Sequence, residues 1–475
     1  MLEKRDFYIN GAWVAPAVPN DFAVIDPSTE EQCAVISLGG HADSDAAVGA
    51  ARAAFDGWSQ TSKEERVALL HRLLEIYNAR SEEMAQAMSM EMGAPMALSR
   101  AQQVGAGSWH LEGFLKAFED FSFESDFTAT EKTLLEPIGV CALITPWNWP
   151  MNQIVLKAVP AMATGCTMVL KPSEIAPLSG LLFADFVHEA GFPAGVFNLV
   201  NGDGAGVGSQ LSAHPEVDMV SFTGSTRAGI AISKAAADTL KRVSLELGGK
   251  GANIIFEDAH PKAAKSGAVR CFRNSGQSCN APTRMLVHRS RYDEAVEMAA
   301  DVATNTHVGP ASEEGKHIGP VVSEAQFNKI QKLIEVGMGE ARLVAGGLGR
   351  PDGLNRGYFV KPTVFADVTN EMTIAREEIF GPVLSIIPFE SDEEAIAIAN
   401  DTPYGLTNYI QTEDDEKRRR VARRLRSGMV ETNGQGFAQG SPFGGYKQSG
   451  NGREGGVFGL EEFLEVKAVS GWAAE

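Results

Sequence analysis

Five short runs rich in apolar and β-branched residues divide the middle of the chain: VCALIT (140–145), TMVLK (167–171), VFNLV (196–200), MVSFTG (219–224) and VSLEL (243–247). Their first residues are 27, 29, 23 and 24 residues apart, which leaves room for one helix between successive strands. This spacing predicts a parallel sheet with helices on both faces. Ligands of such sheets bind at the carboxyl ends of the strands, so the residues that follow these runs are the first site candidates.

Three later strand-like runs predict a second α/β region. They are NIIF from Asn253, RMLVH from Arg284 and PVLSIIPF from Pro382. A Gly- and Pro-rich stretch at 346–362 is typical of a surface loop. We therefore expect a second set of strands after the first.

The first third of the chain predicts helices followed by an extended arm. Apolar residues at helical spacing predict one helix near 46–58. A second helix begins after Ser62, which Glu65 completes as a capping box, and ends at Gly93. Short polar and apolar alternation near 119–133 has no helical period and predicts a hairpin or arm.

The composition excludes several classes of protein. The 475 residues contain 42 Lys and Arg against 61 Asp and Glu, so the net charge is 42 − 61 = −19. That balance repels nucleic acids and anionic membrane surfaces. A basic run within 413–426 follows acidic residues, which is the pattern of a solvated helix with a favourable dipole rather than of a nucleic-acid patch.

The cysteines and apolar segments predict a soluble, cytoplasmic protein. Five cysteines in a chain of this length are too few and too odd in number for a disulfide framework, which favours a reducing compartment. Residues 1–14 carry charges without an apolar core, so no secretory signal is expected. The longest charge-free apolar stretch lies between Lys157 and Lys171 and holds 13 residues, too few to span a membrane.

Two common types of catalytic centre have no support in the sequence. The nine histidines show no His-Glu-x-x-His motif, and the chain has no Cys-x-x-Cys, so we expect no metal site. No Gly-x-Ser-x-Gly motif follows a strand.

Two glycine-containing loops are candidates for phosphate binding. The glycines within 202–208 fail the strict Gly-x-Gly-x-x-Gly pattern and are equally typical of a structural turn. The stretch SFTGSTRAG (221–229) places small residues where a helix should begin, and free N–H groups there suit a pyrophosphate.

Three side chains carry groups that acyl chemistry requires. Cys279 lies in the polar stretch NSGQSCN, Glu246 ends an apolar strand, and Asn148 lies in ITPWNWP. Each also has an ordinary structural interpretation: Cys279 as a small buried thiol, Glu246 as a salt-bridged carboxylate and Asn148 as a turn former. Together they offer a nucleophile, a general base and an oxyanion donor.

At this point the sequence resembles the aldehyde dehydrogenase superfamily over nearly its whole length. The motifs that carry the resemblance are PWNWP (146–150), LKPSE (170–174), FTGST (222–226), LELGGK (245–250), GQSC (276–279), EEIFGPV (377–383) and SPFGGYKQSG (441–450). Their order and intervals match those of the family. The resemblance implies a Rossmann-like parallel-sheet cofactor domain, an α/β catalytic domain and a β oligomerisation arm.

The resemblance also implies the catalytic roles. Cys279 would attack the aldehyde, Asn148 and the Cys279 N–H would bind the oxyanion, and Glu246 would activate the water that hydrolyses the thioester. We expect a lowered pKa for the Cys279 thiol, from a helix dipole and the cofactor charge.

The cofactor implied by the family is NAD. The residues that would contact it are Trp147, Lys171, Ser173, Glu174, Gly224, Ser225, Gly229, Glu378 and Phe380. An acidic Glu174 beside the adenosine ribose would accept a 2′-hydroxyl bond and repel a 2′-phosphate, so we expect NAD rather than NADP.

The substrate is predicted less sharply than the cofactor. In the family the entry tunnel would be lined here by Trp149, Asn152, Gln153, Leu156, Asn280 and Phe437. This mixture favours an aromatic or medium aliphatic aldehyde. No arginine at these positions is placed to bind a substrate carboxylate, although Arg100 or Arg284 could reach the tunnel from elsewhere.

Alternative functions remain open from the sequence. A CoA-acylating semialdehyde dehydrogenase would use a thiol in place of water, but such members commonly lack the base that Glu246 would supply. A thiol esterase without redox chemistry would have no use for the dinucleotide motifs. A structural NAD-binding protein with an inactive site would not need all three catalytic groups.

The resemblance implies three parts and a homo-oligomer. We expect an NAD-binding domain from 1–117 and 138–248, a catalytic domain at 249–447, and an oligomerisation arm from 118–137 and 448–475. Strands of the arm have no partner in their own lobe and would pair with another subunit, in a homodimer or homotetramer.

Overall fold

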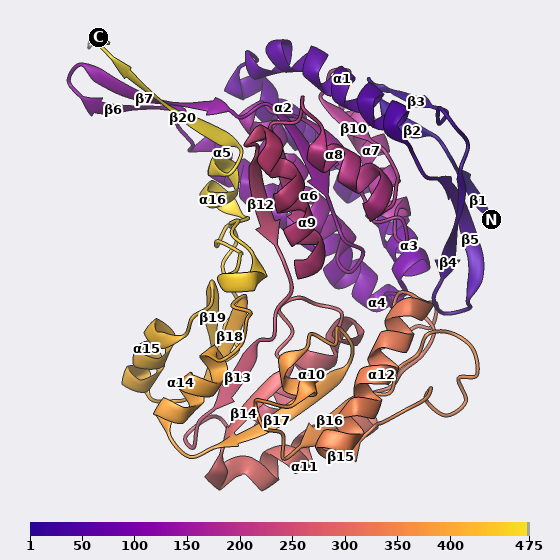
Figure 1. Cartoon of the computed structure of the whole chain (residues 1–475), viewed down its shortest axis with the longest axis vertical. Coiled ribbons are helices and arrows are strands. Elements are labelled where there is room, and N and C mark those ends of the chain that lie inside the picture. The colour runs from indigo at the N-terminus through magenta and orange to yellow at the C-terminus, as the bar shows by residue number, and fades with distance from the viewer. Residues whose placement is uncertain (473–475) are drawn as a thin grey trace.

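Two seven-stranded sheets form the framework of the chain (Figure 1). The computed structural model describes residues 1–472. The strands of the first sheet are, in spatial order, β12 (Arg242–Glu246), β11 (Met219–Thr223), β8 (Val140–Ile144), β9 (Thr167–Lys171), β10 (Phe197–Leu199), β2 (Phe7–Ile9) and β3 (Ala12–Val14). The first five are parallel, as the sequence predicts, and β2 and β3 extend the edge as an antiparallel hairpin.

Helices cover both faces of this first sheet. They are α1 (His41–Ser59), α2 (Lys63–Ala79), α3 (Ser81–Met92), α4 (Met96–Leu98), α5 (Gly105–Glu119), α6 (Pro150–Thr164), α7 (Leu178–Ala190), α8 (Ser209–Ala213) and α9 (Thr226–Ala236). Alternate residues of β8 enter two separate cores: Cys141 and Leu143 pack in one, Val140 and Ala142 in the other. Burial on both faces explains why this strand is apolar at every position.

The predicted helix from Ser62 to Gly93 is in fact two helices. The capping box of Ser62 and Glu65 starts α2 as expected. Arg80, at φ −107° and ψ 21°, leaves the helical conformation and α3 begins at Ser81. The sequence after Arg80 reads Ser-Glu-Glu, which is itself a favourable helix start that the periodicity of apolar residues does not reveal.

The second sheet forms the other lobe, below the first in Figure 1. Its strands are, in spatial order, β15 (Arg342–Ala345), β16 (Thr363–Ala366), β17 (Val383–Phe389), β14 (Arg284–His288), β13 (Ala252–Ile255), β18 (Thr407–Gln411) and β19 (Met429–Thr432). Only β15 runs antiparallel to its neighbour. Its helices are α10 (Ala263–Phe272), α11 (Tyr292–Asn305), α12 (Glu324–Glu340), α13 (Thr373–Arg376), α14 (Asp392–Asn400) and α15 (Asp415–Arg424). The predicted α/β class is confirmed for both lobes.

The basic run forms the surface helix α15. Asp414 caps its first amides, and Val421 is buried beneath it. Arg424 binds Glu393 through two hydrogen bonds of 2.5 and 2.6 Å. The charges are therefore paired on the surface of the lobe.

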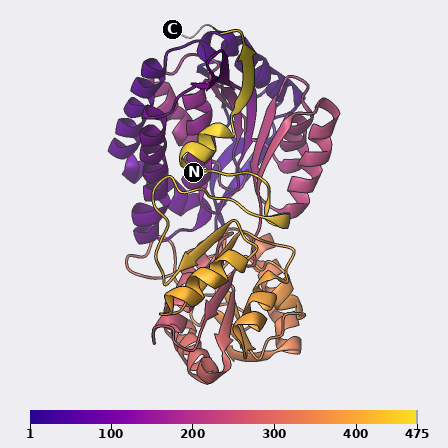
Figure 2. The same ribbon diagram turned by 90° about the vertical axis from the view of Figure 1, so that its left-hand side faces the viewer.

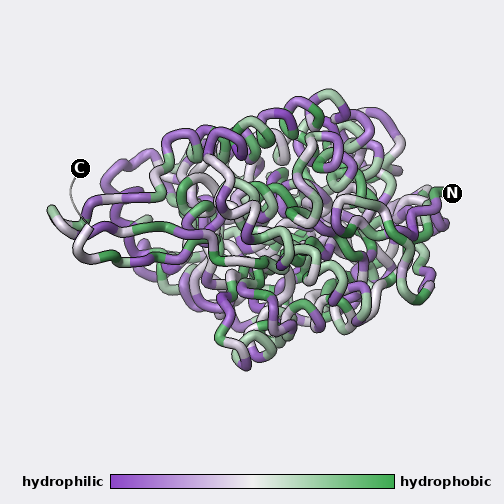
Figure 3. The backbone as a smooth tube through the Cα atoms, turned by 90° about the horizontal axis from the view of Figure 1, so that it is seen from above, coloured by the Kyte–Doolittle hydropathy of each residue, from purple (hydrophilic) through white to green (hydrophobic). Residues whose placement is uncertain are grey.

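Two small sheets complete the fold. An antiparallel sheet of β6 (Glu124–Thr128), β7 (Glu131–Pro137) and β20 (Leu464–Ser470) projects from the upper lobe as an arm (Figures 1 and 3). Its outer residues Phe127 and Val466 are 75% and 71% exposed. At the opposite end, β1 (Leu2–Lys4), β5 (Glu31–Ser37) and β4 (Asp21–Asp26) form a sheet that the sequence did not predict.

The C-terminal segment returns through the upper lobe before it reaches the arm (Figure 2). Ser449 accepts a 2.9 Å bond from the Leu247 N–H, donates one of 2.6 Å to the Gly248 carbonyl, and accepts one of 2.9 Å from the Gly405 N–H. Helix α16 (Gly456–Glu461) packs on α5 and α6. Of the predicted arm segment 448–475, only β20 pairs with the hairpin, and residues 473–475 lie outside the described residues. Within 1–472, none of the helices combines the length and apolar character needed to cross a bilayer.

Candidate active site

The order of strands in the first sheet creates a topological switch point between β8 and β11. From β8 the chain continues to β9 and β10 on one side, and then crosses to β11 and β12 on the other. Loops on the two sides of such a point diverge, and the crevice between them is where dinucleotides bind in open parallel sheets. Trp147 and Asn148 follow β8 here, and Gly224 and Ser225 follow β11.

A cavity of about 220 Å³ opens at this point. Both lobes contribute to its wall, which is formed by Pro146, Trp147, Asn148, Thr223, Gly224, Ser225, Leu247, Gly248, Cys279, Gln326, Lys329, Glu378 and Phe380. Residues that are more than 200 positions apart in the sequence thus meet around one space. The polar groups converge on a mainly apolar surface, as is usual for a ligand site.

A backbone turn in left-handed conformation presents Cys279 to the cavity. Asn274 and Ser275 have φ values of 52° and 56°, and Gly276 follows at 72°. A Cβ on Gly276 would lie 2.0 Å from the Gly381 carbonyl oxygen, so the turn requires glycine there. Such conformations cost free energy and are kept where the surrounding structure holds them.

In the protein alone, the thiol of Cys279 has a raised pKa. The lowering expected from the sequence depends on the charge of a bound cofactor and stays a prediction. Burial, followed by the negative charges of Glu378 and Glu246, raises its pKa to about 12. Two carboxylates near a partly buried sulfur disfavour the thiolate in the protein alone.

Asn148 is held in one orientation beside Cys279. Its Nδ2 donates a 3.1 Å bond to the backbone carbonyl of Gln277. The backbone carbonyl of Asn148 accepts bonds from the side chains of Gln103 and Asn274. An Asn amide has two N–H donors, and this bond uses one of them. The residue is 3% exposed, so its remaining donor acts in a site of low polarity.

Glu246 ends β12 directly behind the cavity wall. It is paired in register with Thr223 and precedes Leu247, both of which line the cavity. It is 3% exposed, and neither carboxylate oxygen has a hydrogen-bond partner among residues 1–472. Burial and the nearby charge of Glu454 raise its pKa well above the usual range. A poorly solvated carboxylate is a stronger base than one in water.

A buried ion pair that the sequence reasoning missed lies next to Glu246. The Lys157 ammonium binds the Glu454 carboxylate and donates a 2.6 Å bond to Thr223 Oγ1, and the side chains of this ion pair are 1% and 6% exposed. Lys157 opposes and Glu454 reinforces the raised pKa of Glu246. A lysine inside the apolar run of α6 was the available clue, because a buried ammonium requires a partner.

Residues predicted to bind the nicotinamide end of a cofactor line the cavity. Trp147 and Phe380 form an edge-to-face pair with ring centroids 5.4 Å apart. Glu378 Oε1 accepts a 2.8 Å bond from the Gly249 N–H. A Cβ on Gly248 would lie 2.4 Å from Glu378 Oε2, so only glycine lets this carboxylate approach.

The segment that carries Glu378 and Phe380 is fixed by α12, which the sequence reasoning also missed. Gln326 donates 2.8 Å to the Phe380 carbonyl, and Lys329 donates 2.9 Å to that of Glu378. Both side chains line the cavity. Nothing in the local sequence of this amphipathic helix distinguishes them from ordinary surface residues.

Lys171, Ser173 and Glu174, three of the predicted cofactor residues, lie along the same sheet edge but do not line the cavity. The Lys171 ammonium ends β9 and donates 2.6 Å to the Gly202 carbonyl and 2.9 Å to that of Pro172. Ser173 and Glu174 follow it, and the Glu174 side chain is 28% exposed. Ser225 caps α9, and Gly229 lets the helix pack against Leu247, since a Cβ there would lie 2.9 Å from its methyl groups.

A sequence model described as the aldehyde dehydrogenase family matches residues 13–469. The chain belongs to the aldehyde dehydrogenase family. A 3-succinoylsemialdehyde-pyridine dehydrogenase from a Pseudomonas species is 53% identical to it over 475 residues, covering 99% of each chain. An aldehyde dehydrogenase structure from Bartonella henselae is 59% identical, with a TM-score of 0.99 over 99% of this chain and 100% of that one. Aldehyde dehydrogenase C from Pseudomonas syringae, solved as a mutant with NAD+ and octanal, is 50% identical, with a TM-score of 0.98 over 99% and 97%. The family resemblance seen in the sequence is confirmed.

The predicted substrate residues of this aldehyde dehydrogenase differ in burial and in the contacts that they make. Trp149 is half-buried and its indole N–H donates 2.8 Å to Ser278 Oγ, next to Cys279. Asn152 is bonded at 2.8 Å to His110 on α5, and Phe437 is 40% exposed. Gln153 and Leu156 are each 2% exposed, and the Asn280 carbonyl accepts the Tyr409 hydroxyl.

Neither arginine considered for a substrate carboxylate is free to bind one. Arg100 is paired on the surface with Glu82 and Glu314. Arg284 is fully buried and donates to three carbonyls and to Asn370. Both guanidinium groups are committed to structural contacts.

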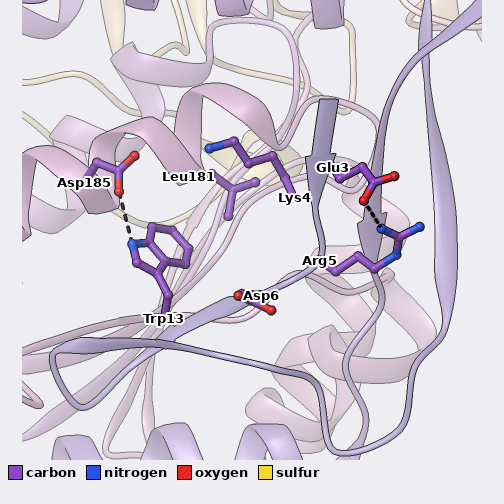
Figure 4. A pocket seen from close by; sticks show the side chains of 7 residues that line it. All are labelled: Glu3, Lys4, Arg5, Asp6, Trp13, Leu181 and Asp185. Carbon is purple, nitrogen blue, oxygen red and sulfur yellow. Dashed lines mark hydrogen bonds and ion pairs between the residues drawn. The ribbon is translucent and has the colours of Figure 1, made fainter. Parts of the chain in front are cut away.

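A hollow of about 390 Å³ at the far edge of the first sheet contains none of the predicted site residues (Figure 4). It is lined by Glu3, Lys4, Arg5, Asp6, Trp13, Leu181 and Asp185. Its charged side chains pair with one another or face solvent, and the Trp13 indole binds Asp185 at 3.1 Å. Within the described part of the chain, no three His, Cys, Asp or Glu side chains gather as a metal site.

Proposed function

We propose that this aldehyde dehydrogenase uses NAD to oxidise an aldehyde to its carboxylic acid, with Cys279 as the nucleophile. The observation that carries the proposal is the cavity at the switch point, which Cys279 and Asn148 share, with Glu246 directly behind it. The NAD+ present in the P. syringae structure supports the choice of cofactor.

The residues at the switch point fit a dinucleotide. The N-terminus of α9 faces the crevice with Gly224 and Ser225 at its start, which suits a pyrophosphate. Gly248 leaves the space in which Glu378 approaches the cavity. Trp147, Glu378 and Phe380 would hold the nicotinamide riboside, with Lys171, Ser173, Glu174 and Gly229 toward the adenosine side. When bound, the nicotinamide supplies the hydride acceptor.

The first chemical step belongs to Cys279 and Asn148. The Cys279 thiol releases its proton to solvent, and the thiolate attacks the aldehyde carbon to form the tetrahedral alkoxide of a thiohemiacetal. The alkoxide oxygen receives bonds from Asn148 Nδ2 and the Cys279 N–H. Because both donors are neutral, they stabilise the oxyanion without holding it too tightly to collapse. Hydride loss from carbon then leaves a thioester on Cys279.

Glu246 completes the reaction as general base. Its raised pKa lets the carboxylate take a proton from a water molecule that attacks the thioester carbonyl. The Cys279 thiol is regenerated and the acid leaves. A base in this position favours water over CoA as the acyl acceptor.

We propose a preference for NAD over NADP from Glu174. Its partly exposed carboxylate would accept the 2′-hydroxyl and repel a 2′-phosphate. The ratio of kcat/KM for the two cofactors tests this, and a higher value for NADP would contradict it.

For the substrate we propose an aromatic or medium aliphatic aldehyde without a carboxylate. Octanal in the P. syringae structure and the pyridine compound named for the Pseudomonas relative belong to these two classes. The structural commitment of Arg100 and Arg284 agrees with an uncharged substrate body. An NADH-formation screen across aliphatic, aromatic and semialdehyde substrates tests this choice.

The central experiment is Cys279→Ala with Cys33→Ala as the control. Cys33 is a half-buried thiol of the small N-terminal sheet, remote from the cavity residues. We expect Cys279→Ala to abolish NADH formation while NAD binding, measured by fluorescence quenching, persists. Dehydrogenation by Cys279→Ala near the rate of the control would refute the proposed nucleophile.

We further propose the domain division and assembly implied by the family. NAD-binding residues 1–117 and 138–248 correspond to the first sheet, and residues 249–447 to the second. The exposed arm strands support pairing in a homodimer or homotetramer, which sedimentation would test. The five free cysteines support a reducing, cytoplasmic location.

A further inference from the structure

A second polar cavity, of about 250 Å³, lies in the other lobe between α10 and the ends of β13 and β18. It is lined by Asn253, His260, Lys262, Ala263, Ser266, Gly267, Arg270, Pro282, Tyr409, Gln411, Glu413, Asn433 and Gly434. None of these residues lines the cavity of Cys279. The space exceeds that of one water molecule several times over.

An unpaired amide donor lies at the bottom of this cavity. Asn253 is 1% exposed, and its Oδ1 accepts a 3.0 Å bond from Gln411. Its Nδ2 has no acceptor anywhere in residues 1–472. A Cβ on Gly267 would lie 2.4 Å from this nitrogen, so the glycine leaves room for the donor. Buried donors without a partner are rare in proteins, and each calls for an occupant.

The N-terminus of α10 forms one wall of the same cavity. The helix has ten residues, and its N-cap, Lys262, makes no side-chain bond to the first amides in the described chain. Lys262, Ala263 and Ser266 of this first turn all line the cavity. The Lys262 and Ala263 amides donate to His260 at 3.1 and 2.9 Å, and the Ser266 amide donates to the Lys262 carbonyl. The first-turn amides that remain free in the described chain are those of Ala264 and Lys265, and with the helix dipole they favour negative charge.

The charged groups around the cavity balance one another. Lys262 and His260 are exposed at its mouth. Arg270 stacks over Tyr409 at 4.5 Å and is neutralised by Glu431, through two hydrogen bonds. Glu413, exposed at the rim, is the one carboxylate that lines the cavity. Attraction for an anion would therefore come from the unpaired Asn253 amide and the helix dipole rather than from net charge.

We propose that this cavity is a binding site for a small oxyanion, a phosphate or a carboxylate. Asn253 Nδ2 would donate to one oxygen, the first-turn amides of α10 and Ser266 to others, and the Lys262 ammonium would balance the charge. This assignment uses no residue of the proposed catalytic mechanism.

The test is titration of the full-length protein with inorganic phosphate and, separately, with acetate, at constant ionic strength. Two lysines of the same helix turn provide the matched variants. Lys262 lines the cavity, whereas Lys265 is exposed outside it and lies 3.9 Å from Asp301. We expect one bound anion per chain, about tenfold weaker binding in Lys262→Glu, and less than twofold change in Lys265→Glu.

A third variant tests the buried donor directly. Asn253→Asp replaces Nδ2 by a carboxylate oxygen of the same shape, and binding should be lost in the folded variant. Tighter binding of phosphate would identify a phosphate site, and tighter binding of acetate would identify a carboxylate site. No saturable binding of either anion, equal weakening by the two lysine variants, or unchanged binding in folded Asn253→Asp would each overturn the proposal. If Asn253→Asp does not fold, the lysine pair decides.

Discussion

Replacing Glu454 by Gln should move the pH dependence of thioester hydrolysis to lower pH. Glu454 is the nearest negative group that raises the pKa of Glu246, and Lys157 opposes it. Gln keeps the shape and can still accept the Lys157 bond, so the ammonium stays in place while one buried negative charge is removed.

The expected size follows from the burial of these groups. Glu246 and Glu454 are 3% and 5% exposed, so solvent screens their repulsion poorly. For an assumed separation of about 10 Å and an effective dielectric constant of about 20, two like charges repel by about 1.7 kcal/mol. Because 1.36 kcal/mol corresponds to one pKa unit, the pKa of Glu246 should fall by about one.

The direction in which the pH profile shifts follows from the role of Glu246 as a general base. A general base works when ionised, so the hydrolysis rate rises as pH passes upward through its pKa. A lower pKa moves this rising limb about one pH unit toward acid. The assay is the steady-state rate after the NADH burst, measured from pH 5 to 10 with a substrate for which hydrolysis limits turnover.

Glu461→Gln is the matched control for this experiment. Glu461 lies in the same C-terminal segment, at the end of α16, but is exposed. Its variant should leave the limb in place. If the rising limb of the pH profile is unchanged in Glu454→Gln, or moves to higher pH, Glu454 does not raise the pKa of Glu246.

Three further predictions concern buried charge and the nucleophile. Lys157→Met should lower the free energy of unfolding by about 3–5 kcal/mol, because it leaves Glu454 buried without its cation; a urea titration measures this, and the double variant Lys157→Met/Glu454→Leu should recover most of the loss. Arg284→Lys should destabilise the second lobe by about 3 kcal/mol or more, since a lysine cannot replace the guanidinium bonds to Lys250, Asn370, Ile398 and Ala399; an unchanged urea midpoint would contradict this. In the cofactor-free protein, alkylation of Cys279 by iodoacetamide should accelerate about tenfold per pH unit from pH 7 to 10, because its pKa of about 12 keeps the thiolate scarce; a plateau near pH 8 would show a normal thiol.

The strands of the first sheet were predictable because burial on both faces leaves an unbroken apolar run. Val140–Ile144 and Thr167–Lys171 match the sequence runs closely for this reason. The break at Arg80 was not predictable from periodicity, because the apolar stripe continues across it from Tyr77 to Met84. Strand boundaries follow local composition, whereas this break is marked only by the Ser-Glu-Glu helix start after Arg80, which apolar periodicity does not reveal.

The candidate site likewise contains some residues that the sequence could predict and others that it could not. Cys279, Glu246 and Asn148 stand in distinctive motifs at strand ends or in turns, so sequence reasoning could select them. Lys157 and Glu454 are 297 residues apart and meet only in the folded chain. The raised pKa of Cys279 also depends on tertiary proximity to Glu378 and Glu246, which no local pattern contains.

The hydrogen bonds that Ser449 makes with Leu247, Gly248 and Gly405 affect when the enzyme can become active during its synthesis. Both lobes can begin to fold while the polypeptide is still emerging from the ribosome, but the wall behind Glu246 is finished only when the segment around Ser449 has been released. A nascent chain should therefore remain inactive until this segment has emerged. A stalled or prematurely stopped product would carry the nucleophile without a functioning base.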